Sequence, residues 1–226
     1  VISLDSAVNK DSRQTHIQQA DPEKIGRGLI QAAYEMVDGN GGIAVLSATA
    51  QATNQNLWIE WMKKELEENP EKYANTPLVK VAYGDDDPTK STSETQAQAL
   101  LTDSSIKVII APTTVGMLAA GKVLQDKQSD VKLTGLGLPS EMAPFIEDGT
   151  CPWMYLWNPV DIGYLSGYTM DALVKGTITG DVGGSFNAGD LGEKKITEAA
   201  DGGTEVMLGD PFKFDTENIA EWKEVY

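Results

Sequence analysis

The chain has 226 residues, of which 41% are hydrophobic, and its formal net charge at pH 7 is −16. This length and composition allow one large domain or two small ones with a sizeable core. The acidic charge argues against a nucleic-acid partner, because a phosphate backbone repels such a surface, and it matches an anionic membrane face poorly.

From Asp21 to Trp157 the sequence alternates between short apolar runs, typical of strands, and amphipathic segments, typical of helices. Asp21-Pro22 predicts a helix start, since Asp is a good N-cap and Pro suits the first helical position. We expect strands near 1–4, 43–46, 79–83, 108–110, 131–136 and 153–157, and helices near 22–38, 57–69, 89–101, 115–124 and 140–145. Such an alternation indicates a parallel sheet covered on both faces. The predicted fold class is α/β, with a Rossmann-like parallel-sheet lobe.

The pattern changes in the last third of the chain. A helix is expected from Asp161 to Lys175, and Gly180 to Gly203 is rich in Gly, Asp and Thr, which indicates loops with a small hairpin. Strand character returns at 206–208 and 212–214, and a short helix is expected within 215–222.

Polar side chains follow several of the predicted strands, and in open parallel sheets ligands bind outside the carboxyl ends of the strands. The residues at these positions are Asp5, Ser47, Thr49, Asn54, Gln55, Pro112, Thr113, Thr114, Leu138, Pro139, Ser140, Trp157 and Asn158. Hydroxyls, amides, one carboxylate and one aromatic ring suit a carbohydrate, whose apolar face stacks on the ring. The simpler alternative is structural: Thr113 and Ser140 suit helix caps, and Trp157-Asn158 suits a core Trp followed by an Asn cap.

Other chemistries have little support. Cys151 is the only cysteine, so no internal disulfide can form, and we expect an inert buried thiol. His16 is the only histidine, which excludes His-pair zinc motifs and leaves one candidate for a His-based triad. The run from Asp85 to Asp87 does not space its oxygens as calcium loops do, so we expect a solvated turn. The sequence predicts no catalytic residue, no metal site and no cofactor.

Five stretches together carry a family resemblance: residues 1–6, 52–58, 110–116, 135–142 and 156–159. The chain resembles the sugar-binding proteins of ABC importers with the type I periplasmic fold. The closest likeness is to the rhamnose-binding proteins, followed by the autoinducer-2 receptors of the same branch. This resemblance implies a receptor that is not an enzyme, with the sugar bound between two lobes.

The resemblance also implies a set of ligand contacts. The binding residues of the autoinducer-2 receptors fall on Asp5, Asn54, Gln55, Pro112 and Thr114. Asn54 replaces an Asp of those receptors and Thr114 replaces an Ala, which favours a deoxyhexose such as rhamnose over autoinducer-2. The complete predicted site is Asp5, Asn54, Gln55, Pro112, Thr114, Leu138, Trp157 and Asn158.

The same mapping predicts how the lobes divide the chain. Residues 6–158 should form the C-terminal lobe. Residues 1–5 and 159–204 should belong to the N-terminal lobe, most of which is expected to lie outside this chain, and residues 205–226 should return to the C-terminal lobe. The helix at 161–175 would then lose much of its docking surface, so we expect it to be displaced, mobile or packed against a neighbouring molecule.

The expected partners are a small sugar and the permease subunits of an ABC importer, with no nucleic acid. The expected location is the periplasm or the outer face of the cytoplasmic membrane. The chain begins with Val1 inside a predicted strand, which is typical of a processed product or a fragment, and both a free receptor and a lipid anchor upstream fit the resemblance. Three alternatives stay open: an autoinducer-2 receptor, the effector core of a sugar-responsive transcription regulator, and an enzyme on a doubly wound sheet.

Overall fold

In the computed structural model, which describes residues 1–226, the chain forms two units. The smaller unit consists of residues 1–21 and 157–211, and the larger unit of residues 22–156 and 212–226. The chain therefore passes from one unit to the other three times, and neither unit is continuous in sequence.

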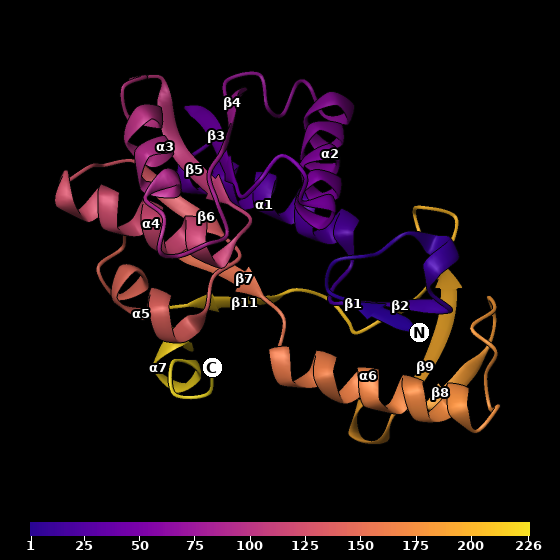
Figure 1. The fold of residues 1–226 in the computed structure, drawn as a ribbon. Coiled ribbons are helices and arrows are strands. Elements are labelled where there is room, and N and C mark those ends of the chain that lie inside the picture. Colours follow the sequence, from indigo (N-terminus) through magenta and orange to yellow (C-terminus); the bar gives the residue numbers. More distant parts are fainter. The chain divides into compact units, whose positions relative to one another are not determined.

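A four-stranded parallel sheet is the centre of the larger unit (Figure 1). Its spatial order is β4-β3-β5-β6, and every neighbouring pair is parallel. The strands are β3 (Gly42–Ser47), β4 (Leu78–Tyr83), β5 (Ile106–Ala111) and β6 (Lys132–Gly135). The central strand β3 is buried along its whole length, which explains why its residues are almost all apolar.

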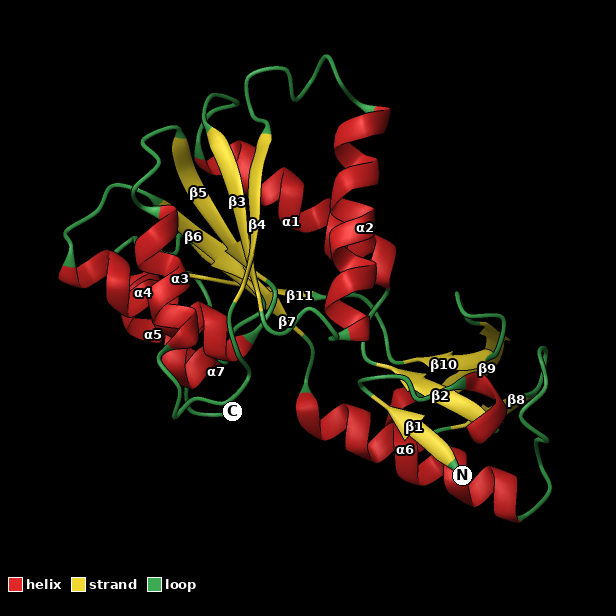
Figure 2. Ribbon diagram, turned by 45° about the horizontal axis from the view of Figure 1, so that its top comes forward, coloured by secondary structure: helices red, strands yellow, loops and turns green.

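Helices cover both faces of this sheet (Figure 2). The helices α1 (Pro22–Met36) and α2 (Thr53–Glu68) pack against each other on one face. On the other face lie α3 (Thr92–Leu100) and α4 (Thr114–Asp126), with α5 (Pro139–Glu147) beside α4. Gly26 allows the close approach of α1 and α2, because a Cβ there would lie 2.5 Å from the Trp61 Cβ.

The last residues of the chain complete the larger unit. Strand β7 (Trp153–Leu156) follows β6 and pairs antiparallel with β11 (Phe212–Asp215). The short helix α7 (Ile219–Trp222) lies beside α5. An edge-to-face cluster joins this strand pair to the C-terminus and consists of Phe212, Phe214, Trp222 and Tyr226.

The smaller unit contains a five-stranded mixed sheet of order β1-β2-β10-β9-β8. Its strands are β1 (Ile2–Leu4), β2 (Thr15–Gln18), β8 (Ser185–Asn187), β9 (Glu193–Glu198) and β10 (Thr204–Met207). The first three strands in this order are parallel, and β10-β9-β8 is antiparallel. The β8–β9 pair is the hairpin predicted between Gly180 and Gly203.

Helix α6 (Pro159–Val174) packs against the sheet of its own unit. The core that it shares with the sheet consists of Ile17, Ile162, Leu165, Ala172, Ile178, Phe186, Ala188, Ile196 and Val206. The expected displacement of this helix is therefore wrong: the two segments of the smaller unit supply enough sheet to bury one face. Its opposite face is exposed, with Met170 53% and Val174 85% accessible and open space around Gly163 and Gly167.

The unit boundaries differ from those expected. The first lies after Asp21 rather than after Asp5, because β2 pairs with β1 and ties residues 6–21 to the smaller unit. The second lies after Leu156, two residues before the expected position. The third lies after Pro211 rather than before Glu205, because β10 pairs with β2.

Candidate functional site

Five of the eight predicted site residues belong to the larger unit and follow strands of its parallel sheet. Asn54 and Gln55 lie in the first turn of α2, after β3, while Pro112 and Thr114 follow β5 and Leu138 follows β6. Because β3, β5 and β6 are consecutive parallel neighbours in the sheet, their carboxyl ends share one edge. The structure thus brings these five positions to the same end of the sheet.

Gln55 is held by its side-chain oxygen. Oε1 accepts hydrogen bonds from Ser47 Oγ at 2.7 Å and from the Ala48 backbone N at 2.8 Å, and the residue is 6% exposed. These bonds fix the amide against the end of β3 and leave Nε2, with its two N–H groups, as the part that is available to a ligand.

Asn54 is held in the same way as Gln55, with its side-chain oxygen bonded to the protein and its side-chain nitrogen unbonded. Its Oδ1 accepts a 2.8 Å hydrogen bond from the Gln55 backbone N, and Nδ2 makes no hydrogen bond within the protein. Both amides therefore offer N–H donors, which suit the lone pairs of sugar hydroxyls.

The helices that begin at this edge lack side-chain caps. The N-cap residues of α2, α4 and α5 are Ala52, Thr113 and Leu138, and none of them accepts a hydrogen bond from its helix. The structural interpretation of Thr113 and Ser140 as caps is wrong: the Thr113 hydroxyl is directed elsewhere, and Ser140 lies inside α5, whose first residue is Pro139. Among the first-turn backbone N–H groups, that of Gln55 is bonded by the Asn54 side chain, and none is bonded by the side chain of an N-cap residue.

Asp86 belongs to this edge, and the sequence did not indicate it. Thr113 Oγ1 donates a 2.9 Å hydrogen bond to Asp86 Oδ1, from the loop after β4. Its neighbours Asp85 and Asp87 behave as the expected solvated turn, with Asp85 Oδ1 accepting from the Asp87 N and Asp87 Oδ1 from the Thr89 N, both at 2.9 Å. The signal for Asp86 in the sequence is its position three residues after β4, within a run of three aspartates that is also typical of a solvated turn.

The other three predicted residues belong to the smaller unit. Asp5 directly follows β1, is half-buried and has a φ of +62°, a left-handed conformation that Asp tolerates better than most residues. Asn158 caps α6, since its Oδ1 accepts from the Val160 backbone N at 2.9 Å. The structural interpretation of Asn158 is thus confirmed, and only its Nδ2 remains for a ligand. Trp157 precedes it and is half-buried.

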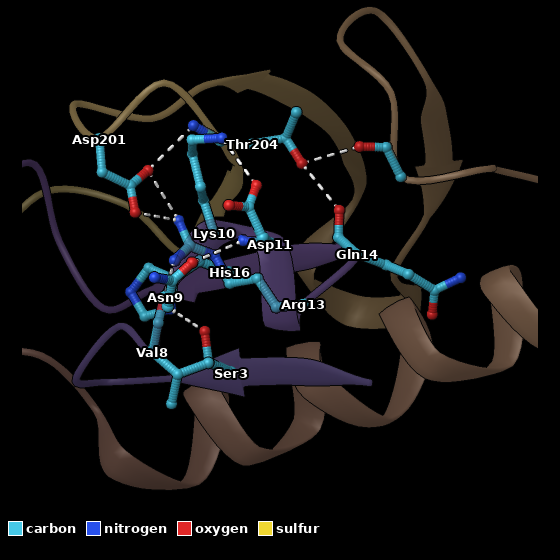
Figure 3. A network of polar contacts seen from close by, with 12 residues as sticks. Ser3, Val8, Asn9, Lys10, Asp11, Arg13, Gln14, His16, Asp201 and Thr204 are labelled. Carbon is cyan, nitrogen blue, oxygen red and sulfur yellow. Dashed lines mark hydrogen bonds and ion pairs between the residues drawn. The ribbon is translucent and has the colours of Figure 1, made fainter.

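A network of polar contacts occupies the smaller unit, and Ser3 and His16 are buried members of it (Figure 3). Ser3 Oγ and His16 Nδ1 lie 2.9 Å apart across β1 and β2, and Glu205 of β10 is aligned with His16 on its other side. Serine, histidine and glutamate in a row are the residue types of a hydrolytic triad. Ser3 is 7% exposed and His16 only 2%, so a substrate cannot reach them. We interpret the row as part of the fold.

Glu205 makes the smaller unit sensitive to pH. Burial first, and then the charges of Asp21 and Asp201, raise the pKa of its carboxyl to about 7, although the charge of Arg13 opposes them. Burial lowers the pKa of the adjacent His16, and the charge of Arg13 adds to that effect. A carboxyl whose folded pKa is raised favours the folded state while it is protonated and loses this contribution as the pH rises through the folded value.

We therefore expect the Glu205 contribution to stability to fall between about pH 4.5 and 7, by about 1–3 kcal/mol. Glu205→Gln should remove this slope and raise the stability at pH 8. Hydrogen exchange of β2 and β10 amides between pH 5 and 8, corrected for intrinsic exchange rates, measures the effect. Glu198→Gln, on exposed β9, is the matched control and should leave the slope unchanged. An unchanged slope in Glu205→Gln would show that other groups control the pH response.

Cys151 is fully buried, and burial raises the pKa of its thiol far above the usual value, which agrees with the expected inert thiol. No three or more His, Cys, Asp or Glu side chains are grouped so that they could hold a metal ion. None of the helices combines the length and apolar character needed to cross a lipid bilayer.

Comparison with known proteins gives a consistent result. Residues 1–178 match the family model described as the periplasmic binding protein domain. A solute-binding protein of an ABC transporter from Clostridium phytofermentans, solved with bound L-rhamnose, is 51% identical, with a TM-score of 0.94. The match covers 100% of this chain and 73% of that one.

Two further solved structures are similar. A sugar ABC transporter protein from Actinomyces odontolyticus is 39% identical with a TM-score of 0.79, over 98% of this chain and 70% of that one. LsrB from Clostridium saccharobutylicum, in complex with AI-2, has a TM-score of 0.85 at 20% identity, over 98% of this chain and 74% of that one. The last likeness concerns the fold alone. The predicted α/β class with parallel sheets is confirmed.

Proposed function

Because the chain belongs to the periplasmic binding protein domain family, we propose that it is the solute receptor of an ABC importer whose solute is L-rhamnose or a similar deoxyhexose. The observation that carries this proposal is the 51% identity, over the whole of this chain, to a solute-binding protein with bound L-rhamnose. The receptor acts by binding and delivery, without a chemical step.

The chemistry of the site residues supports a neutral sugar. In the larger unit, Asn54 and Gln55 present amide N–H donors, Thr114 a hydroxyl and Leu138 an apolar surface for the methyl group of a deoxyhexose. In the smaller unit, Asp5 supplies a carboxylate and Asn158 an amide donor, and the Trp157 ring suits the C–H face of a sugar. We propose that each unit contributes its own group of contacts.

The family context adds a location and a partner to the proposal. Receptors of this kind work outside the cytoplasmic membrane, so we place the protein in the periplasm or on the outer face of that membrane, with or without a lipid anchor. The partner is the permease of the importer. Sugar binding shifts the receptor towards the conformation that the permease recognises, by the differential affinity of the sugar for that conformation.

Calorimetric titration of the full-length protein with L-rhamnose tests the proposal. We expect saturable heat with one sugar per chain, and at a sugar concentration 100 times the Kd a stabilisation of about 2.7 kcal/mol. Titration with autoinducer-2 under the same conditions should give little or no heat. If L-rhamnose gives neither heat nor a thermal shift, the sugar assignment is wrong, and saturable heat with autoinducer-2 alone would point to the signalling receptors.

A further inference from the structure

The five predicted site residues of the larger unit offer amide donors but contain no carboxylate to act as a charged hydrogen-bond acceptor. The side-chain oxygens of Asn54 and Gln55 are already bound to protein N–H and O–H groups, and Pro112 and Leu138 have no polar side chain. Thr114 offers one hydroxyl. A sugar hydroxyl donates one hydrogen bond as well as accepting others, so a set made almost entirely of donors satisfies only half of its capacity.

Asp86 supplies the missing acceptor at the same edge of the sheet. Its loop follows β4, yet its side chain is bound to Thr113, which follows β5. Because β3 lies between β4 and β5 in the sheet, the loop must cross the carboxyl end of β3 to reach Thr113. That end of β3 carries Ser47, the residue that holds Gln55.

The loop that carries Asp86 is fixed by its other residues. The Gly84 N donates to the Ser47 O at 2.8 Å, and Ser93 Oγ bonds both the N and the O of Asp85, each at 3.1 Å. A Cβ at Gly84 would lie 2.3 Å from Ser93 Oγ, so the loop needs glycine there to pack this closely. Asp86 is therefore presented by an anchored loop.

One carboxylate oxygen of Asp86 is available to a ligand. Thr113 is 7% exposed and its hydroxyl binds only Oδ1, whereas Asp86 is exposed and its Oδ2 makes no hydrogen bond within the protein. The Thr113 hydroxyl donates to this carboxylate and does not cap α4, although Thr113 is the N-cap residue of that helix.

We propose that Asp86 is a sugar-binding residue of the larger unit, whose carboxylate accepts a hydrogen bond from a ligand hydroxyl, and that Thr113 is the residue that positions it. This inference rests on the proposed sugar-receptor function. It assigns the carboxylate a part in specificity: a charged acceptor at the same edge of the sheet as two amide donors selects a ligand that has a hydroxyl at the matching ring position.

Calorimetry with L-rhamnose on Asp86→Asn tests the assignment. Asparagine keeps an oxygen for Thr113 but replaces the charged acceptor with an N–H donor, so we expect affinity to fall about 10- to 100-fold. Asp87→Asn is the matched control: it removes the same charge from the same loop, where Asp87 bonds Thr89 and pairs with the Nζ of Lys90 at 3.8 Å, and it should bind as the wild type does.

Two further measurements separate direct contact from an effect on the loop. Mono-deoxy analogues of L-rhamnose should include one whose affinity is the same for wild type and Asp86→Asn, because the hydroxyl that Asp86 binds is absent from it. Thr113→Val should weaken rhamnose binding and Thr113→Ser should restore it, since serine keeps the hydroxyl that donates to Asp86.

The outcomes distinguish this inference from the proposed function. If the wild type binds rhamnose and Asp86→Asn binds it with the same affinity, the role of Asp86 is overturned and the receptor function stands. An equal loss in Asp87→Asn shows a general charge effect and also overturns it. Absence of rhamnose binding by the wild type overturns the receptor assignment and, with it, this inference.

Discussion

Asp201→Ala is expected to lower the free energy of unfolding of the smaller unit by about 3–5 kcal/mol, because it leaves a buried cation without its counter-ion. The Arg13 side chain is 1% exposed, and its NH2 group lies 2.8 and 2.7 Å from the two carboxylate oxygens of Asp201 (Figure 3). Its NH1 group donates to the Val8 O, and its Nε has no partner. Glu205 also interacts with the Arg13 charge, but no hydrogen bond joins the two side chains.

The reverse substitution should be milder, and this asymmetry is the sharpest test. Arg13→Met removes the buried charge and fills a similar space with an apolar chain, while Asp201, whose side chain is 43% exposed, can be hydrated. Hydrogen exchange of β2 and β10 amides reports on the smaller unit, with β3 and β5 amides as the internal reference. Equal losses in the two variants, or a smaller loss in Asp201→Ala, would contradict the account of Arg13 as an inaccessible charge.

Gln55→Met is expected to abolish measurable rhamnose binding and to destabilise the larger unit by about 2–4 kcal/mol. The substitution leaves the Ser47 hydroxyl and the Ala48 N–H buried without an acceptor, at about 1–3 kcal/mol for each unsatisfied group. It also removes the Nε2 donor. Chemical denaturation monitored by β3 exchange measures the first effect, and calorimetry with L-rhamnose measures the second.

Gln55→Glu separates these two roles. Glutamate keeps an acceptor oxygen for Ser47 and Ala48 and suits the first turn of a helix, so the stability of the larger unit should be nearly unchanged. It lacks the Nε2 donor, so rhamnose affinity should fall at least about tenfold. Gln51→Met, at an exposed position before the same helix, controls for the loss of an amide. Wild-type affinity in Gln55→Glu would exclude Nε2 as a ligand donor.

The parallel sheet of the larger unit was predictable because a strand that is buried on both faces is a continuous run of apolar residues. Val108, Ile109 and Ile110 are all fully buried, and the run of apolar residues reports that burial without help from context. Strand β3 is likewise an apolar run that is buried along its whole length. Helix starts were predictable where local chemistry decides them, as at Asp21-Pro22.

The smaller unit was harder to predict because its strands are stabilised by distant partners. Strand β2, with the sequence Thr-His-Ile-Gln, is buried throughout, but only Ile17 is apolar, and its partners lie in β1 and in β10 near residue 205. Strand β9 is mostly charged because its exposed positions face water. Neither has a hydrophobic period that a local pattern could show.

The sequence predicted which residues follow the strands, but it did not predict the hydrogen bonds among them. The strand-end rule indicated Asp5, Gln55 and Thr114, and the family resemblance implied that they are ligand contacts. The engagement of the Gln55 oxygen by Ser47, and the pairing of Asp86 with Thr113 across 27 positions, depend on the order of strands in the sheet, which no local pattern contains.

The three passages of the chain between units have a consequence for protein synthesis. Strand β10 closes the sheet of the smaller unit on β2, about 190 residues earlier, and β11 pairs with β7 only after β10 has been made. A ribosome therefore releases β1 and β2, which can pair with each other, long before β10 exists. One edge of β2 stays without its partner until β10 has emerged, and the β2–β10 pairing must be among the last steps of folding.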